Sequence, residues 1–221
     1  MGNLPSMWLW RPPGVYRPQE DTWLAAEALA AAGVPEGARV LDVCAGTGVL
    51  GILAGLAGAA EVTAVDRSRR AVVAAWCNGR ARGVPVRVRR GDFADLVGGE
   101  TYDVVLANPP YVPAPGTPAR GRAVAWDAGP DGRSVLDRLC AVLPLLLADK
   151  GMAVVVHSAL ADEDQTLRQL RGGGLKAAVV ARRVVPFGPV LRRRAEWLRA
   201  NGFVEPGRDR EELVVVRADA A

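Results

Sequence analysis

The sequence is poor in the residues that build disulfide frameworks and metal centres. Its 221 residues include one histidine, two lysines and three cysteines. The cysteines, Cys44, Cys77 and Cys140, are odd in number and form no CxxC pair, so neither a disulfide framework nor a zinc site is indicated. We therefore expect no metal, and a reducing compartment such as the cytoplasm.

Long uncharged apolar runs are also missing. No stretch is long enough to span a bilayer, and the N-terminus lacks a basic region followed by an apolar one, so we expect neither a membrane association nor a signal peptide. The hydrophobic fraction of 50% can fill a sizeable core. We expect a single domain over residues 1–221, with an N-terminal extension at 1–18 and an inserted segment at 186–207.

The formal net charge of +4 is modest and comes almost wholly from arginine, because Lys150 and Lys176 are the only lysines. The abundance of Ala, Gly and Val indicates that this bias follows genomic base composition. It is weak support for an anionic partner, and Arg192–Arg194 is expected to be a solvated face. The tryptophans are expected in the core or at its rim, and His157 is expected to be structural.

Strands alternate with helices along the chain, which favours a mainly parallel sheet covered on both faces. The predicted strands are 39–44, 62–66, 84–88, 103–107, 152–157, 177–185 and 212–216. The predicted helices are 20–32, 48–57, 69–80, 135–147 and 162–171. A rim rich in Pro and Gly is expected at 112–124. In the inserted segment, Leu191, Ala195 and Leu198 share one helical face.

A glycine-rich turn, Asp42-Val43-Cys44-Ala45-Gly46-Thr47-Gly48, joins the first predicted strand to its helix. Glycines let the backbone approach a ligand closely, and the carboxyl ends of parallel strands are the usual ligand site. Asp66 ends the second strand, where it can accept hydrogen bonds from ribose hydroxyls. Asp92 follows the third strand and can accept from an adenine amino group, while Phe93 can pack on its ring. The sequence therefore predicts a nucleoside cofactor.

The same glycines allow other interpretations. Gly46-x-Gly48-x-x-Gly51 satisfies the dinucleotide fingerprint, so a nicotinamide dehydrogenase must be considered. A purely structural turn is the other alternative. Asp42 favours a methyl donor, because a carboxylate beside a pyrophosphate is repelled, whereas one beside a cationic sulfonium is tolerated.

The second chemical element is Asn108-Pro109-Pro110-Tyr111, which follows the fourth predicted strand. Asn offers an amide oxygen, the prolines fix the backbone and remove donors, and Tyr offers a flat face. Together these groups predict a clamp for a planar nitrogen such as an amide or a base. A rigid turn that merely ends the strand is the alternative.

In combination these motifs resemble the class I methyltransferases that use S-adenosylmethionine (AdoMet), and most closely the HemK-type protein glutamine methyltransferases of the compact branch without an N-terminal domain. The resemblance covers about residues 15–185 and the last strand. Its further motifs are Tyr16-x-Pro18-x-Glu20-Asp21-Thr22 and Trp126-x-x-Gly129-x-Asp131-Gly132. Two residues depart from the family pattern, since Cys44 and Ala128 stand where glycine is usual.

The resemblance implies a Rossmann-like class I fold, with a seven-stranded, mainly parallel sheet of order 3-2-1-4-5-7-6, strand 7 antiparallel, and helices on both faces. It implies that AdoMet is converted to S-adenosylhomocysteine, and that the acceptor is the glutamine of a Gly-Gly-Gln motif in a peptide-chain release factor. The implied cofactor-binding residues are Thr22, near the methionine part, Asp42, Cys44, Gly46, Gly48, Asp66, Asp92, Phe93 and Asn108. The implied substrate-binding residues are Asn108, Pro109, Pro110 and Tyr111, of which Asn108, Pro109 and Tyr111 are catalytic.

Other functions remain open beside this one. A nucleic-acid adenine or cytosine amino methyltransferase usually needs a base-flipping surface or a target-recognition region, for which 221 residues leave little room. A small-molecule N-methyltransferase and a binding protein that retains AdoMet without catalysis are further alternatives. The residues themselves name neither the acceptor protein nor an activating subunit.

Overall fold

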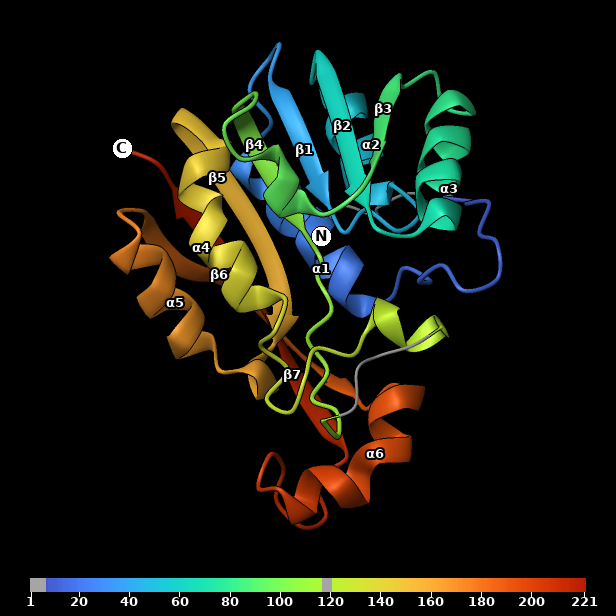
Figure 1. The fold of residues 1–221 in the computed structure, drawn as a ribbon, viewed down its shortest axis with the longest axis vertical. Helices are drawn as coiled ribbons and strands as arrows, with labels where there is room; N and C mark the ends of the chain where they lie inside the picture. Colours follow the sequence, from blue (N-terminus) through green and yellow to red (C-terminus); the bar gives the residue numbers. More distant parts are fainter. Residues whose placement is uncertain (1–6, 117–120) are drawn as a thin grey trace.

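The computed structural model describes residues 7–116 and 121–221, and Figure 1 shows a twisted sheet between two layers of helices. The strands are β1 (Arg39–Val43), β2 (Glu61–Asp66), β3 (Val86–Arg90), β4 (Tyr102–Ala107), β5 (Leu147–Ser158), β6 (Lys176–Pro186) and β7 (Arg210–Asp219). The helices are α1 (Glu20–Ala32), α2 (Val49–Leu56), α3 (Arg69–Arg80), α4 (Leu136–Leu146), α5 (Glu163–Gly172) and α6 (Pro189–Ala200). Three short 3-10 helices are η1 (Phe93–Leu96), η2 (Gly121–Ala125) and η3 (Ala159–Ala161).

The sheet has the order β3-β2-β1-β4-β5-β7-β6, as predicted. Strands β1 to β5 pair in parallel, and β7 is antiparallel to both β5 and β6. The carboxyl ends of β1, β2 and β4 and the amino end of β7 therefore all lie at the same end of the strands. The chain reverses its winding direction between β1 and β4, where open α/β sheets bind ligands. The fold thus places the glycine turn and Asn108 at one crevice.

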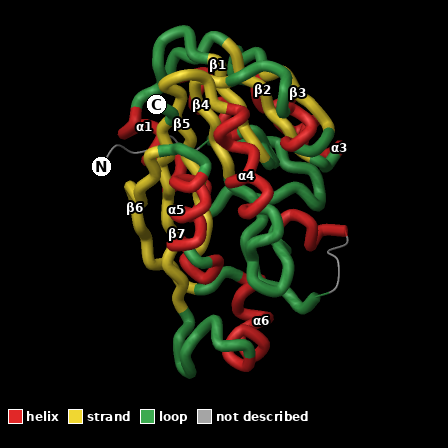
Figure 2. The backbone as a smooth tube through the Cα atoms, turned by 60° about the vertical axis from the view of Figure 1, so that its left-hand side comes forward, coloured by secondary structure: helices red, strands yellow, loops and turns green. Residues whose placement is uncertain are grey.

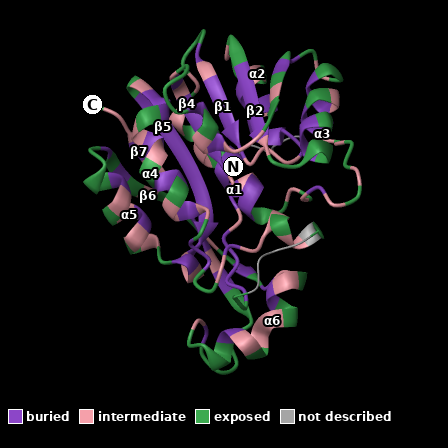
Figure 3. Cartoon of the chain, viewed as in Figure 1, coloured by how far each residue is buried: buried purple, intermediate pink, exposed green. Residues whose placement is uncertain are grey.

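The core lies on both faces of the central strands, which Figure 3 shows as an almost continuous buried layer. Val40, Leu41, Val104 and Val105 have no exposed surface, because helices cover the sheet on both sides. Helices α4 and α5 pack on one face and α1 and α2 on the other, as Figures 1 and 2 show together. Because helices cover both faces of the central strands, these strands are almost continuously apolar in sequence.

The predicted elements are all present, but some boundaries differ. Strand β5 begins at Leu147, five residues before its predicted start. The prediction missed this first part because the polar residues Asp149 and Lys150 interrupt the apolar pattern. Lys150 adopts a left-handed φ of 59° there. Pro144 lies in the last turn of α4, where its missing N–H removes one helical hydrogen bond, and the helix ends at Leu146.

The N-terminal segment, of which residues 7–18 are described, lies against α3. The Trp10 amide donates to Asn78 Oδ1 at 2.8 Å, and Asn78 Nδ2 donates back to the Trp10 carbonyl at 3.0 Å. Arg70 Nη1 donates to the Pro13 carbonyl at 3.0 Å. Residues 1–6 of the expected extension, and 117–120 of the expected rim, lie outside the described part of the chain.

Helix α6 fills the connection between β6 and β7. Leu191 and Leu198 are buried as the helical pattern predicts, and Trp197 stacks on Phe203 with ring centroids 5.8 Å apart. The helix begins with Pro189, whose fixed φ suits a first turn. Across the described ranges, no helix combines the length and apolarity that crossing a bilayer requires.

Candidate active site

Three residues of the glycine turn adopt left-handed backbone conformations. The φ angles are 57° at Cys44, 55° at Gly46 and 77° at Gly48. Cys44 therefore adopts a conformation that glycine takes without strain but that is strained for a residue with a Cβ. At Gly48 a Cβ would lie 2.7 Å from the Ala75 Cβ of α3, so glycine is required there by packing as well as by φ.

Asp66 ties this turn to the end of β2. Its Oδ2 accepts a hydrogen bond from the Gly46 amide at 3.0 Å, and its Oδ1 accepts one from the Ser68 amide at 2.8 Å. Burial raises the pKa of Asp66, while the two amides and Arg67 act in the opposite direction. Each carboxylate oxygen keeps a further lone pair, so the side chain can still accept from hydroxyls such as those of a ribose.

Asp42 lies beneath the turn and is buried. Its Oδ2 accepts from the Gly51 amide at 2.9 Å, one of the free amides at the start of α2. Burial raises the pKa of Asp42 to about 8, with a smaller contribution from Asp66, although the Gly51 amide lowers it. These contacts give Asp42 a structural role in holding α2, and its expected contact with a cofactor stays a prediction.

Asp92 begins η1 and accepts from the Ala94 amide at 3.0 Å. Its Oδ1 also pairs with Arg138 Nη2 of α4 at 2.8 Å. Burial acts to raise the pKa of Asp92, but the Ala94 amide and Arg138 outweigh it and hold the pKa below its usual value. The Arg138 guanidinium lies 5.4 Å from the centroid of the buried Phe93 ring. Sequence reasoning missed Arg138, and the packing of Phe93 on adenine stays a prediction.

Asn108 follows β4 and is held by α1. Its Nδ2 donates to Thr22 Oγ1 at 3.1 Å, and Thr22 Oγ1 donates to Asp21 Oδ1 at 3.1 Å. The Thr22 hydroxyl uses its only proton in the bond to the Asp21 carboxylate, so toward Asn108 it can only accept a hydrogen bond. The group of Asn108 that faces Thr22 must therefore be its NH2 group. The hydrogen bonds therefore orient Asn108 Oδ1 away from Thr22.

Asp21 is the centre of this network. Besides Thr22, the hydroxyls of Tyr16 and Tyr111 donate to its Oδ2 at 2.8 and 3.0 Å. Burial, together with the negative charge of Asp21, raises the pKa of each tyrosine well above the usual value for a tyrosine. Both hydroxyls therefore keep their protons and act as donors. The sequence indicated Asp21 only as part of a motif. Tyr111 is buried with its hydroxyl engaged, and its stacking on a substrate stays a prediction.

The segment after Tyr111 is braced by the downstream motif. The Val112 amide donates to the Trp126 carbonyl at 2.8 Å, and the Ala128 amide donates to the Val112 carbonyl at 3.1 Å. At Gly132 φ is 75° and a Cβ would lie 2.5 Å from the Tyr111 carbonyl oxygen, so only glycine fits. Ala128 is fully buried where the family pattern has glycine, which the fold accommodates.

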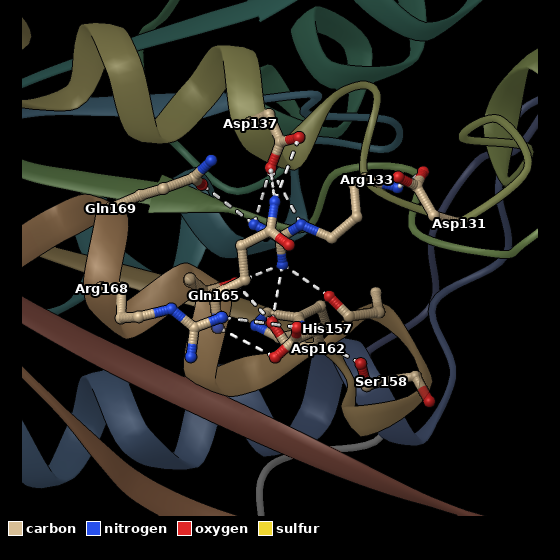
Figure 4. A network of polar contacts seen from close by, with 11 residues as sticks. Asp131, Arg133, Asp137, His157, Ser158, Asp162, Gln165, Arg168 and Gln169 are labelled. Carbon is tan, nitrogen blue, oxygen red and sulfur yellow. Dashed lines mark hydrogen bonds and ion pairs between the residues drawn. The ribbon is translucent and has the colours of Figure 1, made fainter. Parts of the chain in front are cut away.

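A buried arginine that no motif indicated holds this loop to the rest of the domain (Figure 4). Arg133 is 2% exposed and lies among α4, η3 and α5. It pairs with Asp137 at 2.8 Å. It also donates to the Asp162 carbonyl at 2.8 Å, Thr166 Oγ1 at 2.7 Å and Gln169 Oε1 at 3.0 Å. One guanidinium thereby fixes the loop that braces Tyr111.

Two other titratable side chains are buried at this edge. His157 Nδ1 donates to the Ser158 carbonyl at 2.9 Å, and burial lowers the pKa of His157 to about 4, so the ring is neutral near pH 7. This supports the structural role expected for it. Glu211, at the start of β7, is 7% exposed. Burial raises the pKa of Glu211 to about 7, with Ser158 lowering it and Asp21 raising it.

Arg194 of α6 faces inward, so the expectation of a solvated face is wrong for this residue. Its Nη2 lies 2.6 Å from Asp127 Oδ1, and its Nη1 donates to the Pro113 carbonyl at 3.2 Å. Arg192 and Arg193 are exposed as expected. The described residues contain no cluster of three His, Cys, Asp or Glu side chains that could hold a metal ion.

Comparison of the sequence with known proteins gives three relevant similarities. Residues 7–121 match the family model described as the methyltransferase small domain. The chain is 33% identical over 181 residues to a putative protein N5-glutamine methyltransferase of Methanocaldococcus jannaschii, covering 81% of this chain and 90% of the relative. It is 34% identical over 157 residues to the release factor glutamine methyltransferase of Mycolicibacterium smegmatis, covering 66% of this chain and 54% of that relative.

The fold is similar to that of solved methyltransferases. The Mtq2–Trm112 complex of E. cuniculi, responsible for methylation of the eRF1 translation termination factor, aligns with a TM-score of 0.62 and 22% identity. The alignment covers 94% of this chain and 99% of the matched one. At this level of identity the likeness concerns the fold.

Proposed function

The chain belongs to the HemK-type family of AdoMet-dependent protein glutamine methyltransferases, and we propose that its own methyl acceptor is a glutamine side-chain amide in a peptide-chain release factor. The observation that carries the proposal is the fixed orientation of Asn108, whose NH2 end is held by Thr22. The names of the relatives support a protein glutamine as the acceptor. The proposal implies a cytoplasmic location, because translation terminates there.

Asn108 and Pro109 provide the acceptor half of the reaction. An amide nitrogen is a poor nucleophile, since its lone pair is delocalised into the carbonyl. Asn108 Oδ1 and the Pro109 carbonyl each accept one N–H of the acceptor amide, which aims the nitrogen at the donor. AdoMet would supply an electrophilic methyl group: the S–CH3 bond of the sulfonium would break as the N–CH3 bond forms, S-adenosylhomocysteine would leave with the bonding electron pair, and the acceptor nitrogen would lose one proton to solvent. The contribution of the protein is therefore positioning and preorganised electrostatics.

The glycine turn and the acids beyond it provide the donor half. We propose that Asp66 accepts from the ribose hydroxyls and that Asp92 accepts from the adenine amino group, beside Phe93. The lone pairs left on the Asp66 oxygens fit such a role. Cys44 presents a neutral thiol, because burial and the carboxylates nearby raise its pKa. Thr22 Oγ1 donates to Asp21 and accepts from Asn108, so one lone pair is left to accept from the ammonium of the methionine part.

We further propose that the segment between β6 and β7 docks the protein substrate. Arg194 fastens α6 to the loop after Tyr111 through Asp127 and the Pro113 carbonyl. Arg192 and Arg193 remain exposed on the same helix. A substrate held by α6 would therefore lie next to the Asn108 side of the site.

The proposal is tested with purified protein, labelled AdoMet and a release factor, with mass spectrometry to locate the methyl group. We expect label on the glutamine of the Gly-Gly-Gln motif. Asn108→Ala should abolish transfer, because it removes the acceptor for one N–H, while AdoMet affinity measured by calorimetry changes by less than about threefold.

A release factor whose motif glutamine is replaced by alanine serves as the control and should stay unlabelled. When a cell lysate replaces the release factor, label in nucleic acid would instead support an adenine or cytosine acceptor. Normal turnover by the Asn108→Ala variant would contradict the assignment of the site.

A further inference from the structure

Positive charge is concentrated in one part of this chain. Between Asp66 and Asp92 there is no Asp or Glu, although the rest of the chain contains 24 acidic and 20 basic side chains. The arginines of this stretch are Arg67, Arg69, Arg70, Arg80, Arg82, Arg87, Arg89 and Arg90. Base composition can explain arginine in place of lysine, but not the absence of acids. The net charge of +4 therefore conceals a strongly basic segment.

The fold gathers these arginines at one border of the molecule. The segment consists of the turn after β2, helix α3 and β3, and β3 is a border strand that pairs only with β2 in the sheet order. Figure 1 shows α3 beside β3, away from α6, and Figure 2 shows the same separation. All of these arginines except the half-buried Arg82 are exposed, and we call the exposed set the arginine face. Among the described residues, one of them, Arg87, forms an ion pair, with Glu100 at 3.6 Å.

Exposed tryptophans lie among these arginines. Trp76 of α3 is 46% exposed, and the Arg80 guanidinium lies 5.3 Å from its ring centroid. Trp8 and Trp10, 75% and 40% exposed, are brought to α3 by the N-terminal segment. Arg82 donates to the Trp8 carbonyl, and Asn78 bonds to the Trp10 backbone. Three flat side chains that were expected in the core or at its rim thus border a basic surface.

We propose that the arginine face binds RNA. Arginine matches phosphate geometry, and counterion release makes a basic surface attractive to a polyanion. Exposed tryptophans provide stacking platforms for unpaired bases. An acidic peptide would satisfy the guanidinium groups but would leave these rings without flat partners. The face lies away from α6 in both views, so RNA on it and a protein substrate docked on α6 would occupy different surfaces.

The proposal is tested by fluorescence anisotropy with a labelled RNA hairpin whose loop holds about 20 unpaired nucleotides. We expect binding that weakens steeply between about 50 and 200 mM salt. The charge-reversal variant Arg69→Glu/Arg80→Glu/Arg89→Glu should bind at least about tenfold more weakly and with a shallower salt dependence. Trp76→Ala should weaken binding severalfold while the salt dependence stays unchanged.

The matched control is Arg192→Glu/Arg193→Glu/Arg199→Glu on α6, which changes the net charge equally. If RNA binding depends on where the positive charge lies, this α6 variant should retain RNA affinity within about twofold. AdoMet affinity and thermal melting verify the fold of each variant. The arginine-face variant should still methylate a release factor in the absence of RNA. The methylation assay therefore tests the proposed function, and the RNA-binding assay tests the present proposal.

Three results would overturn the proposal. The first is no RNA binding by the unaltered protein at low salt. The second is an equal loss of binding in both triple variants, which would indicate net charge alone. The third is competition by poly-glutamate as strong as competition by unlabelled RNA, which would indicate an acidic protein partner.

Discussion

At the residue scale, the network around Asp21 shows how a small side chain can control a reacting group. Thr22 does not bond to the Asn108 oxygen, yet its hydroxyl determines which way the Asn108 amide points. If the amide turned over, an NH2 group would face the N–H groups of the acceptor and repel them. We therefore propose that Thr22 is a positioning residue that acts through Asn108.

We expect Thr22→Val to lower kcat by about 10- to 100-fold, because a small misplacement of a positioning group is costly. The KM for AdoMet should rise by less than kcat falls, because the lost hydroxyl accounts for at most one hydrogen bond to the cofactor. Steady-state kinetics separates these two effects, and Thr22→Ser should restore most of kcat because it returns the hydroxyl. A variant without the hydroxyl that kept full kcat would show that packing alone orients Asn108.

At the element scale, α6 is a helix with one inward guanidinium. Arg194 and Asp127 form a largely buried pair, and the same arginine holds the Pro113 carbonyl. Leu191 and Leu198 provide the apolar part of the contact. Few groups hold α6 to the loop that follows Tyr111. A single substitution among them should therefore be enough to loosen the helix.

We expect Arg194→Ala to loosen α6, because it leaves the Asp127 carboxylate without its cation. Hydrogen exchange of residues 189–200 should become faster, and the KM for the release factor should rise about three- to tenfold at unchanged AdoMet affinity. Arg89→Ala, which removes an exposed arginine of β3 away from α6, is the control. Equal kinetics for both variants would contradict the docking role of α6.

At the scale of the whole molecule, buried acids make stability depend on pH. The pKa of Glu211 is raised from its ordinary 4.5 to about 7, chiefly by burial. Between these values the folded state binds more protons than the unfolded state, so the free energy of unfolding falls as the pH rises through this window. His157 has the opposite effect, since its lowered pKa makes stability fall as the pH drops from 6.5 toward about 4.

We expect Glu211→Gln to be more stable than the unaltered protein near pH 8, by an amount on the order of 3 kcal/mol, and similar to it near pH 4. The difference in free energy of unfolding between the two proteins isolates Glu211 from His157. Urea titrations across this pH range measure it, and Glu205→Gln, an exposed carboxyl, serves as the control. A stability difference independent of pH would show that the carboxyl does not titrate in this window.

Most of the fold was predictable because its signals are local. The strands are short apolar runs, and Gly46, Gly48 and Asn108 stand in motifs with fixed spacing. Arg133, Arg138 and Asn78 were missed because their partners lie far along the chain, as with Arg133 and Thr166. The uneven charge was visible in the sequence, but only the packing of α3 beside β3 turned it into one surface.

The Asp21 carboxylate has one further consequence. Tyr16, on the side of the N-terminal segment, and Tyr111, on the acceptor side, both donate to the same oxygen atom. A ligand that stiffens Tyr16 thereby restricts Tyr111 as well. Thermodynamic reciprocity then requires that the two substrates alter each other's affinity by the same factor. The shared Asp21 oxygen is therefore a physical route by which binding of the donor and binding of the acceptor would be coupled.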